Sequence, residues 1–292
     1  MKKILITGSQ GQLGYELQAT IPNGYEYLAT DKDELDITNP DAVNAYVTEH
    51  QSDVIINAAA YTAVDKAEEE TALAITINTN GAANLASAAK KHNCKLVQIS
   101  TDFVFDGKAC SPYPVDAKTD PDGYYGKTKR DGDNKVLEIL DDNALIIRTS
   151  WLYSAHGNNF VKTMLRFMSE REELGIIADQ IGTPTWANSL ANAIWKAIEL
   201  NTTGTHHWSD AGVASWYDFA HAIMEEGIAI GLLEKPITIK PITTADYPTP
   251  ASRPCYSVMD KTTTWKALEM QSEHWRIALR HMLIELKNKE TN

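Results

Sequence analysis

The chain has 292 residues, of which 43% are hydrophobic and 23% are charged, which is the composition of an ordinary globular protein. Its formal net charge of −12 makes nucleic acid and anionic membrane surfaces unfavourable partners. Its apolar runs, such as residues 4–6 and 54–56, are much shorter than the ~20 residues that a membrane span requires. We therefore expect a protein that binds neither nucleic acid nor a membrane.

The N-terminus and the cysteines indicate a cellular setting. Two lysines precede the apolar run at residues 4–6, but that run is short and ends in a glycine-rich turn, so we expect a strand there and no signal peptide. Cys94, Cys110 and Cys255 are widely spaced and odd in number, which favours neither a disulfide framework nor a metal site. These features predict a protein of the reducing cytoplasm.

The first half of the chain alternates between strand-like and helix-like segments. Short apolar runs typical of strands buried on both faces lie at residues 3–7, 25–29, 54–57, 95–100 and 144–149. Helical patterns lie between them, from residue 12, over 41–50 behind Asn39 and Pro40, over 68–92 with a break near 80–81, and over 124–139. Repeated units of this kind predict an α/β fold with a doubly wound parallel sheet of the Rossmann type.

The second half of the chain is less regular. Proline and glycine interrupt it at residues 182–184 and 248–254, and helical patterns cover 186–200, 216–230 and most of 261–289. We expect a dinucleotide-binding domain over residues 1–150 and a smaller α/β substrate-binding lobe over residues 151–292. Segments around residues 150–205 are expected to cross between the two.

A glycine-rich loop follows the first expected strand. Gly8, Gly11 and Gly14 have the spacing G-x-x-G-x-x-G, and Gln10, Gln12 and Leu13 lie between them. Glycines in such a turn let backbone N–H groups approach a pyrophosphate, and the next helix directs its positive end at the anion. An ordinary strand–helix turn is the alternative, but the strand before and the helix after favour a dinucleotide site.

Acidic residues near the end of the second strand suit the adenosine end of that cofactor. Asp31 lies about 20 residues beyond the central glycine, where a carboxylate accepts the ribose 2′-hydroxyl and repels a 2′-phosphate. Lys32 follows and would soften that repulsion, while Asp36 and Ile37 are candidates for the adenine wall. Solvated loop charges are the alternative for Asp31 and Lys32, so both NAD(H) and NADP(H) remain candidate cofactors.

Tyr125 and Lys129 form a Tyr-x-x-x-Lys pair, which places both side chains on one face of the expected helix. Ketone reduction leaves an alkoxide that must be protonated, and a nearby ammonium lowers the pKa of a tyrosine that donates this proton. Thr101 ends the fourth expected strand, where its hydroxyl would hold the keto oxygen. The pair alone is weak evidence, since a surface helix can carry it by chance, but the glycine loop and Thr101 favour a reductase.

These elements together resemble the extended short-chain dehydrogenase/reductase superfamily, and longer segments are similar to its dTDP-4-dehydrorhamnose reductase family. The resemblance runs from residue 1 to about residue 290 in the expected order. The segments that carry it are residues 57–65 (NAAAYTAVD), 100–107 (STDFVFDG), 148–151 (RTSW), 179–185 (DQIGTPT) and 253–257 (RPCYS).

The resemblance implies a reaction and a role for each matching residue. The reaction is hydride transfer from NADPH or NADH to the C4 keto group of dTDP-4-dehydro-L-rhamnose, giving dTDP-L-rhamnose. Tyr125 would donate the proton, Lys129 would lower its pKa and bind the nicotinamide ribose, and Thr101 would orient the keto oxygen. The glycine loop would bind the pyrophosphate. The expected cofactor lining further includes Ala58, Ala59, Ala60, Tyr61 and Asn78, and the expected sugar-nucleotide contacts are Thr62, Val64, Asp102, Phe103 and Trp151.

The resemblance also suggests roles for Trp151, Arg253 and Glu16, and each role has an alternative. Trp151 would cover the apolar face of a deoxysugar, or pack in a core. Arg253 would neutralise the substrate diphosphate, or form a structural ion pair. Some family members form dimers bridged by magnesium; Glu16 matches one ligand position, but residues 186–189 supply no further ligand. We therefore predict no metal site, and a monomer or a homodimer.

Two other classes of protein remain as alternatives. Sugar-nucleotide epimerases and dehydratases share the glycine loop and the Tyr–Lys pair, but a dehydratase would carry Asp-Glu after the threonine, where this chain has Asp102-Phe103. A non-catalytic regulatory homologue of methionine adenosyltransferase would bind a partner protein instead. The intact set of Thr101, Tyr125 and Lys129 favours the reductase.

Overall fold

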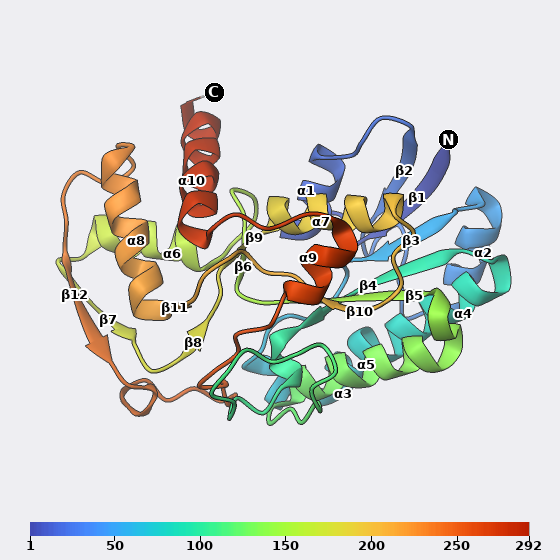
Figure 1. The fold of residues 1–292 in the computed structure, drawn as a ribbon, viewed down its shortest axis with the longest axis horizontal. Helices are drawn as coiled ribbons and strands as arrows, with labels where there is room; N and C mark the ends of the chain where they lie inside the picture. The colour runs from blue at the N-terminus through green and yellow to red at the C-terminus, as the bar shows by residue number, and fades with distance from the viewer. Residues whose placement is uncertain (292) are drawn as a thin grey trace.

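A six-stranded parallel sheet forms the larger part of the molecule (Figure 1). The structure is a computed structural model and describes residues 1–291. The strands lie in the order β10-β5-β4-β3-β1-β2, so the chain reverses its direction of winding after β2. Their bounds are β1 Lys2–Thr7, β2 Tyr25–Thr30, β3 Val54–Asn57, β4 Lys95–Thr101, β5 Ala144–Thr149 and β10 Gly204–His207. The expected α/β fold with a doubly wound parallel sheet is confirmed.

Helices cover both faces of this sheet because alternate strand residues point to opposite sides. Ile4, Ile6 and their neighbours pack against α1 (Gln12–Ala19), α7 (Ala187–Glu199) and α9 (Thr262–Leu268). Leu5 and its neighbours pack against α2 (Pro40–His50), α4 (Ala82–His92) and α5 (Tyr124–Leu140). The helices expected at residues 12, 41–50 and 124–139 are confirmed, and the Asn39 side chain caps α2 as predicted.

The segment expected to form a helix over residues 68–92 lacks the expected break. A 3₁₀ turn, η1 (Lys66–Glu68), and a short helix, α3 (Thr71–Ala74), lead into a π-helical stretch, η2 (Ile75–Gly81), and then directly into α4. The break expected near residues 80–81 is therefore wrong. Gly81 is used for close packing, because a Cβ there would lie 2.8 Å from the Ile37 side chain. Such π-helical stretches occur frequently at functional sites.

A second, smaller lobe lies beside the carboxyl ends of the sheet strands, at the left of Figure 1. Its core joins three helices to a parallel pair of strands and is centred on buried residues such as Phe219, Leu279 and Met282. The helices are α6 (Phe160–Glu170), α8 (Trp216–Ala229) and α10 (Trp275–Thr291), and the paired strands are β7 (Glu173–Ile177) and β12 (Thr238–Ile242). The shorter strands are β6 (Leu152–Tyr153), β8 (Ile181–Gly182), β9 (Thr185–Trp186) and β11 (Ala214–Ser215). This lobe also has one 3₁₀ turn, η5 (Thr244–Asp246). Two further 3₁₀ turns belong to the sheet lobe, η3 (Asp102–Val104) and η4 (Asp141–Asn143).

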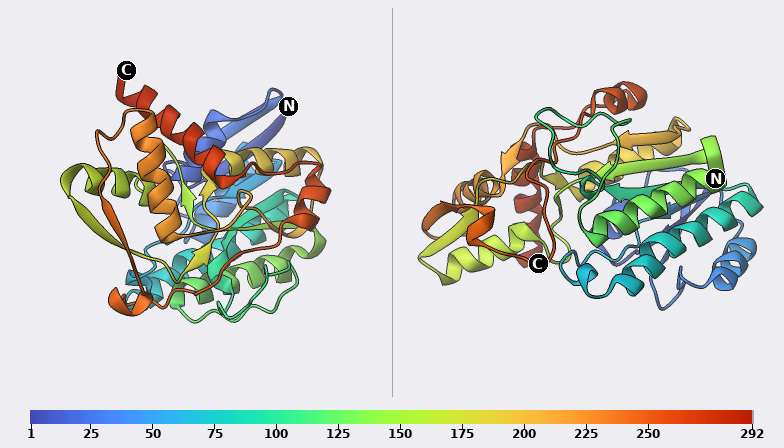
Figure 2. Two further views of the ribbon diagram at one scale, coloured as in Figure 1. Left: turned by 60° about the vertical axis from the view of Figure 1, so that its left-hand side comes forward. Right: turned by 90° about the horizontal axis from the view of Figure 1, so that it is seen from below.

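The chain crosses between the lobes after residue 150. It enters the second lobe at β6, returns to cover the sheet with α7, and adds β10 as the edge strand beside β5. β10 is not among the strands expected from the sequence, because its residues Gly204–His207 do not form an apolar run. Figure 2 shows the same exchange from two other directions, with the C-terminal α10 lying against the second lobe.

Glu16 on α1 connects the two lobes. Its carboxylate is 1% exposed and accepts hydrogen bonds from the Ser154 hydroxyl (2.7 Å) and the Asn188 side-chain amide (3.1 Å). The position that the family resemblance associates with magnesium therefore holds an internal contact. Within residues 1–291, the structure has no group of three or more His, Cys, Asp or Glu side chains placed to hold a metal ion. No helix in this range is long and apolar enough to cross a bilayer.

Candidate active site

A cavity of about 880 Å³ lies where the carboxyl ends of the sheet strands meet the second lobe, the usual ligand position of such folds. Most of the residues predicted to bind cofactor or substrate line it, although they come from segments far apart in the sequence. The cofactor candidates in the lining are Gly8, Gln10, Gly11, Gln12, Leu13, Asp31, Lys32, Asp36, Ile37, Ala58, Ala59, Ala60, Tyr125 and Lys129. The substrate candidates in the lining are Thr62, Val64, Thr101, Asp102, Phe103 and Trp151.

The glycine loop is packed too closely for side chains. Gly8 has a positive φ of 70°, and a Cβ on it would lie 2.6 Å from the backbone nitrogen of Ala59. A Cβ on Gly14 would overlap the carbonyl oxygen of Gly8. Gly11 is the N-cap of α1 and supplies no side-chain cap, so the first N–H groups of that helix face the cavity without a capping side chain. This arrangement can bind an anionic group through backbone N–H donors.

Asp31 follows β2 and is tied to the glycine loop. Its carboxylate accepts hydrogen bonds from the backbone nitrogens of Gln10 (3.1 Å) and Lys32 (2.8 Å). Asp36, further along the same segment, accepts from the backbone and the hydroxyl of Thr38. Those hydrogen bonds lower the pKa of Asp36. The loop after β2 therefore places one carboxylate beside the glycine turn and another farther along the cavity.

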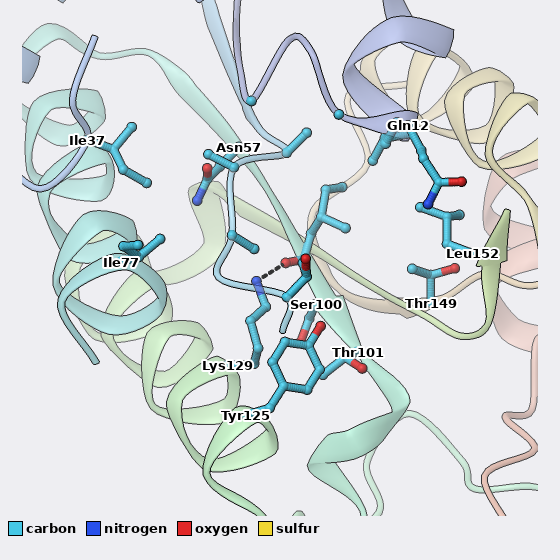
Figure 3. A pocket seen from close by; sticks show the side chains of 18 of the residues that line it. Gln12, Ile37, Asn57, Ile77, Ser100, Thr101, Tyr125, Lys129, Thr149 and Leu152 are labelled. Carbon is cyan, nitrogen blue, oxygen red and sulfur yellow. Dashed lines mark hydrogen bonds between the residues drawn. The ribbon is translucent and has the colours of Figure 1, made fainter. Parts of the chain in front are cut away.

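Tyr125 and Thr101 meet at the base of the cavity (Figure 3). The Thr101 hydroxyl accepts a hydrogen bond from the backbone nitrogen of Phe103 (3.2 Å) and donates one to the Asp102 carboxylate (3.1 Å). Burial raises the pKa of Tyr125 to about 12; the Thr101 hydroxyl opposes this rise, and the negative charges of Asp102 and Asp133 add to it. Tyr125 therefore keeps its proton at neutral pH and can act as an acid.

Lys129 lies one turn along α5 from Tyr125, as predicted, and its side chain is 3% exposed. Its ammonium donates a 2.6 Å hydrogen bond to the carbonyl oxygen of Ile99, drawn as a dashed line in Figure 3. Lys129 is not among the groups that shift the pKa of Tyr125. The sequence predicts a lowered pKa for this phenol, whereas in the structure its pKa is raised. The reason is that burial of the phenol outweighs the other influences on it.

A buried carboxylate lies beneath this pair. Asp133, one further turn along α5, is 3% exposed and accepts a hydrogen bond from the Ser100 hydroxyl. Burial raises the pKa of Asp133 to about 6, although the charges of Lys129 and Arg148 and the Ser100 hydroxyl all act to lower it. In turn, burial lowers the pKa of Lys129 and the charge of Asp133 opposes that change. The site therefore has a second layer of charge that sequence reasoning missed.

Aromatic side chains border the part of the cavity predicted to receive the substrate. The ring of Phe103 lies edge-on to that of Tyr125, with centroids 5.6 Å apart. Trp151 follows β5 and lines the cavity at the border with the second lobe. Such rings provide flat apolar surfaces beside the hydroxyls of Thr101 and Tyr125, a combination that suits a sugar ring.

Comparison with known proteins agrees with this geometry. The family model described as the RmlD substrate binding domain matches residues 1–288. A dTDP-4-dehydrorhamnose reductase of Aggregatibacter actinomycetemcomitans is 43% identical over 290 residues, covering 97% of this chain and 98% of that protein. This chain belongs to the dTDP-4-dehydrorhamnose reductase family. The resemblance inferred from its motifs is thereby confirmed.

A solved structure of the family supports the assignment. The dTDP-4-dehydrorhamnose reductase of Bacillus anthracis, in complex with NADP, matches with a TM-score of 0.92 and 39% identity, over 98% of this chain and 100% of that chain. Another relative has a different printed activity: the dTDP-4-keto-6-deoxy-D-glucose reductase of Streptomyces niveus is 36% identical, over 94% of each chain. Relatives of similar identity thus reduce different dTDP-linked keto sugars.

Three residues predicted from the family resemblance lie outside the cavity lining. Asn78 is 2% exposed; its amide pairs with the backbone N–H and C=O of Tyr61 and donates to the Thr128 hydroxyl. The Tyr61 hydroxyl donates to Glu70. Arg253 forms a two-pronged ion pair with Asp65, which is the structural alternative considered for it. Asn78 therefore joins α5 to the segment after β3, a structural role that needs no direct contact with a ligand.

The lining also includes residues that sequence reasoning did not select. Thr149, Ser150 and Leu152 flank Trp151 at the carboxyl end of β5, a position that could have identified them. Gly157, Asn158 and Asn159 come from the second lobe, and no motif pointed to them. Asn159 donates a 2.9 Å hydrogen bond to the Gln12 side chain, so this lobe reaches the glycine loop. The other unselected lining residues are Leu35, Thr38, Asn57, Leu73, Thr76, Ile77, Ile99 and Ser100.

Proposed function

We propose that this protein reduces the C4 keto group of dTDP-4-dehydro-β-L-rhamnose to give dTDP-L-rhamnose, with NADPH or NADH as the reductant. The observation that carries the proposal is the grouping of Thr101, Tyr125 and Lys129 at the base of one cavity. The glycine loop lines the same cavity, and so does Trp151. Family membership over nearly the whole chain supports the same reaction. We expect it to act in the cytoplasm, as a monomer or a homodimer.

The residues present suit a dinucleotide. Gly8 and Gly14 pack against neighbouring backbone where a Cβ would not fit, which keeps the turn tight. The uncapped N-terminus of α1 would offer N–H donors to a pyrophosphate. Asp31 would accept the ribose 2′-hydroxyl, with Asp36 and Ile37 beside the adenine. The side chain of Lys32 would favour a 2′-phosphate. This mixture of charges supports the use of both NADH and NADPH.

The chain's own residues then donate a proton to the C4 oxygen of the sugar and hold that oxygen in position. Reduced nicotinamide, when bound, supplies the hydride for C4 of the sugar. Tyr125 donates its phenolic proton to the C4 oxygen, because an alkoxide is a stronger base than a phenolate even when the pKa of the phenol is about 12. The Thr101 hydroxyl turns from Asp102 to hydrogen-bond the same oxygen and hold it in place. Lys129, on the same face of α5, binds the nicotinamide ribose.

A second candidate function is reduction of dTDP-4-keto-6-deoxy-D-glucose. The Streptomyces niveus relative with that printed activity favours it, since it matches this chain over nearly its whole length. The two substrates differ in sugar stereochemistry but not in the nucleotide or the keto position. Both reactions would use Thr101, Tyr125 and Lys129 in the same roles, so the site chemistry alone does not separate them.

The experiment is a comparison of substrates with the purified protein. We would measure kcat/KM from the loss of nicotinamide absorbance with both dTDP-linked keto sugars, and with UDP- and GDP-linked analogues, and assign product stereochemistry by NMR. We expect the highest kcat/KM with dTDP-4-dehydro-L-rhamnose. A higher value with the D-gluco substrate would establish the second function. Equal values for all three nucleotides would contradict dTDP selectivity, and binding without turnover would indicate a non-catalytic homologue.

A further inference from the structure

Trp151 has an unusual backbone conformation. Its φ of 46° is in the left-handed region, where bulky residues are strained and persist only if the surroundings fix them. The surroundings do so here. The Trp151 carbonyl accepts a 3.2 Å hydrogen bond from the Thr185 nitrogen, and the Ser150 hydroxyl donates to the Thr183 carbonyl at 2.8 Å. The turn that bears Trp151 is therefore held by one segment of the second lobe, residues 183–185.

The indole of Trp151 is held as firmly as its backbone. It stacks on the indole of Trp216, with ring centroids 3.6 Å apart and planes inclined by 5°. Gly182 packs against the same indole, because a Cβ there would lie within 2.8 Å of three Trp151 ring atoms. Aromatic pairs left to themselves prefer offset or edge-on arrangements with centroids ~4.5–7 Å apart. The close overlap therefore reflects the fixed positions of the two backbones.

Both contacts come from one small structural unit. Strands β8 and β11 pair so that Gly182 lies opposite Ala214, two residues before Trp216. Trp216 begins α8 behind a capping box formed by Ser215 and Asp218, and its ring also packs on Phe160. Trp216 is not part of the cavity lining, whereas Trp151 is. Trp216 thus stands behind Trp151 with respect to the cavity.

We propose that Trp216 and Gly182 are positioning residues that hold the Trp151 indole against the sugar of the substrate and so help to set specificity for a deoxysugar. The inference rests on the proposed function, in which Trp151 contacts that sugar. Trp216 stacks on one face of the indole, and the lack of a Cβ at Gly182 leaves the space that the ring occupies. A ring fixed before binding loses less conformational freedom when substrate arrives, which improves affinity.

The test uses three variants of the whole protein. Gly182→Ala adds one methyl group against the indole, Trp216→Leu removes the stacking ring, and Trp216→Phe restores an aromatic ring. We expect the first two to lower kcat/KM for the keto-sugar nucleotide by about 10–100-fold, mainly through KM, as small misplacements of a positioned group do. Trp216→Phe should recover most of the loss. The cofactor dissociation constant should stay unchanged in all three.

A spectroscopic measurement and a matched control separate positioning from general damage. The circular dichroism signal of the coupled indoles should disappear in Trp216→Leu, and in Trp151→Phe. The control is Trp275→Phe, because Trp275 is 6% exposed, packs on Phe219 in the same lobe and lies outside the cavity lining. It should leave both KM and the coupled signal in place.

The possible failures are distinct. A wild-type protein without turnover of any keto-sugar nucleotide would contradict the proposed function, and that result precedes all variants. An active wild type with unchanged KM in both Gly182→Ala and Trp216→Leu would overturn only the positioning role. An equal rise of KM in Trp275→Phe would also overturn it, because the effect would then come from loosening of the lobe.

Discussion

Lys129 donates its 2.6 Å hydrogen bond to the backbone carbonyl of Ile99, although Tyr125 lies one turn away on the same helix. Ile99 lies on β4, two residues before Thr101, so this bond joins α5 to the strand that ends in Thr101. Burial and the charges of the two carboxylates, Asp102 and Asp133, raise the pKa of the phenol to about 12, although the Thr101 hydroxyl acts to lower it. Tyr125 thus keeps its proton at neutral pH, as the proposed proton donor must, and Lys129 lines the same cavity.

Replacement of Tyr125 by phenylalanine tests the proton donor. The change removes one oxygen and leaves the ring against Phe103, so packing should be preserved. We expect kcat to fall by about 10²–10⁴, the usual contribution of a positioned general acid. The cofactor dissociation constant, measured by fluorescence titration, should not change, because the phenol acts on substrate.

The neighbouring tyrosine provides the matched control. Tyr124 is 41% exposed and lies outside the cavity lining, so Tyr124→Phe should keep the wild-type kcat. If Tyr125→Phe also kept a near wild-type kcat, the proton would have to come from another donor, such as water held by Thr101, and the proposed mechanism would be wrong.

Replacement of Lys129 by methionine should affect cofactor binding as well as turnover. Methionine is similar in length and suits the buried position, but it removes the ammonium that the proposal assigns to the nicotinamide ribose. We expect the cofactor dissociation constant to rise by about tenfold or more, the loss of a charge-assisted hydrogen bond. Lys127→Met, on another face of α5 and outside the cavity lining, is the control and should bind normally. Unchanged cofactor affinity in Lys129→Met would remove Lys129 from the ribose site.

Much of the fold could be predicted because its signals are local. Apolar runs located β3 and β5 at their observed bounds, and Asn39-Pro40 located the start of α2, since caps and buried strands leave a pattern within a few residues. The sixth strand, β10, has no such pattern. Residues Gly204–His207 form a strand because they pair with β5, which lies more than 50 residues earlier in the sequence. No short window of sequence reveals such a pairing.

The candidate site likewise has some features that the sequence predicts and others that it does not. The glycine loop and the Tyr125–Lys129 pair follow from spacing, and the structure brings them to one cavity. The surroundings of that pair do not follow from spacing. Asp133 acts through burial, and the contacts of Trp151 come from Gly182 and Trp216 in other segments of the second lobe. The raised pKa of Tyr125 likewise depends on burial, which only the packed structure reveals.

Asp31 should set the balance between the two cofactors. We predict that the wild type uses NADH and NADPH with kcat/KM values within about tenfold of each other. Asp31→Asn removes the charge that repels a 2′-phosphate but keeps an acceptor for the Gln10 nitrogen, so it should shift the kcat/KM ratio towards NADPH by about tenfold.

Two further variants check the origin of that shift. Asp31→Ala should shift the ratio in the same direction but lower both kcat/KM values, because the glycine loop loses its acceptor. Asp33→Asn removes an exposed charge of the same loop outside the cavity lining and should leave the ratio as it is. A ratio unaffected by either change at Asp31 would show that this carboxylate is not at the ribose.

Asp133 should make stability fall as pH rises through the acidic range. Burial raises its pKa from 3.8 to about 6 in the folded protein, so between these values the folded state binds more protons than the unfolded state. The free energy of unfolding therefore decreases with pH there and levels off above about pH 6, for a loss of about 3 kcal/mol. Asp133→Asn has no such proton to lose. Its stability relative to the wild type should increase by up to that amount between about pH 4 and about pH 7.

The measurement is the urea unfolding midpoint of both proteins at intervals across that range, with the unfolding slope checked for two-state behaviour. Asp131→Asn is the matched control, because Asp131 lies on the same helix and its side chain is 49% exposed, where it pairs with Arg130. Its stability curve should run parallel to that of the wild type. A constant gap between Asp133→Asn and the wild type over the whole range would mean that Asp133 stays ionised throughout. In that case Lys129, Arg148 and Ser100 would stabilise its charge enough to offset burial.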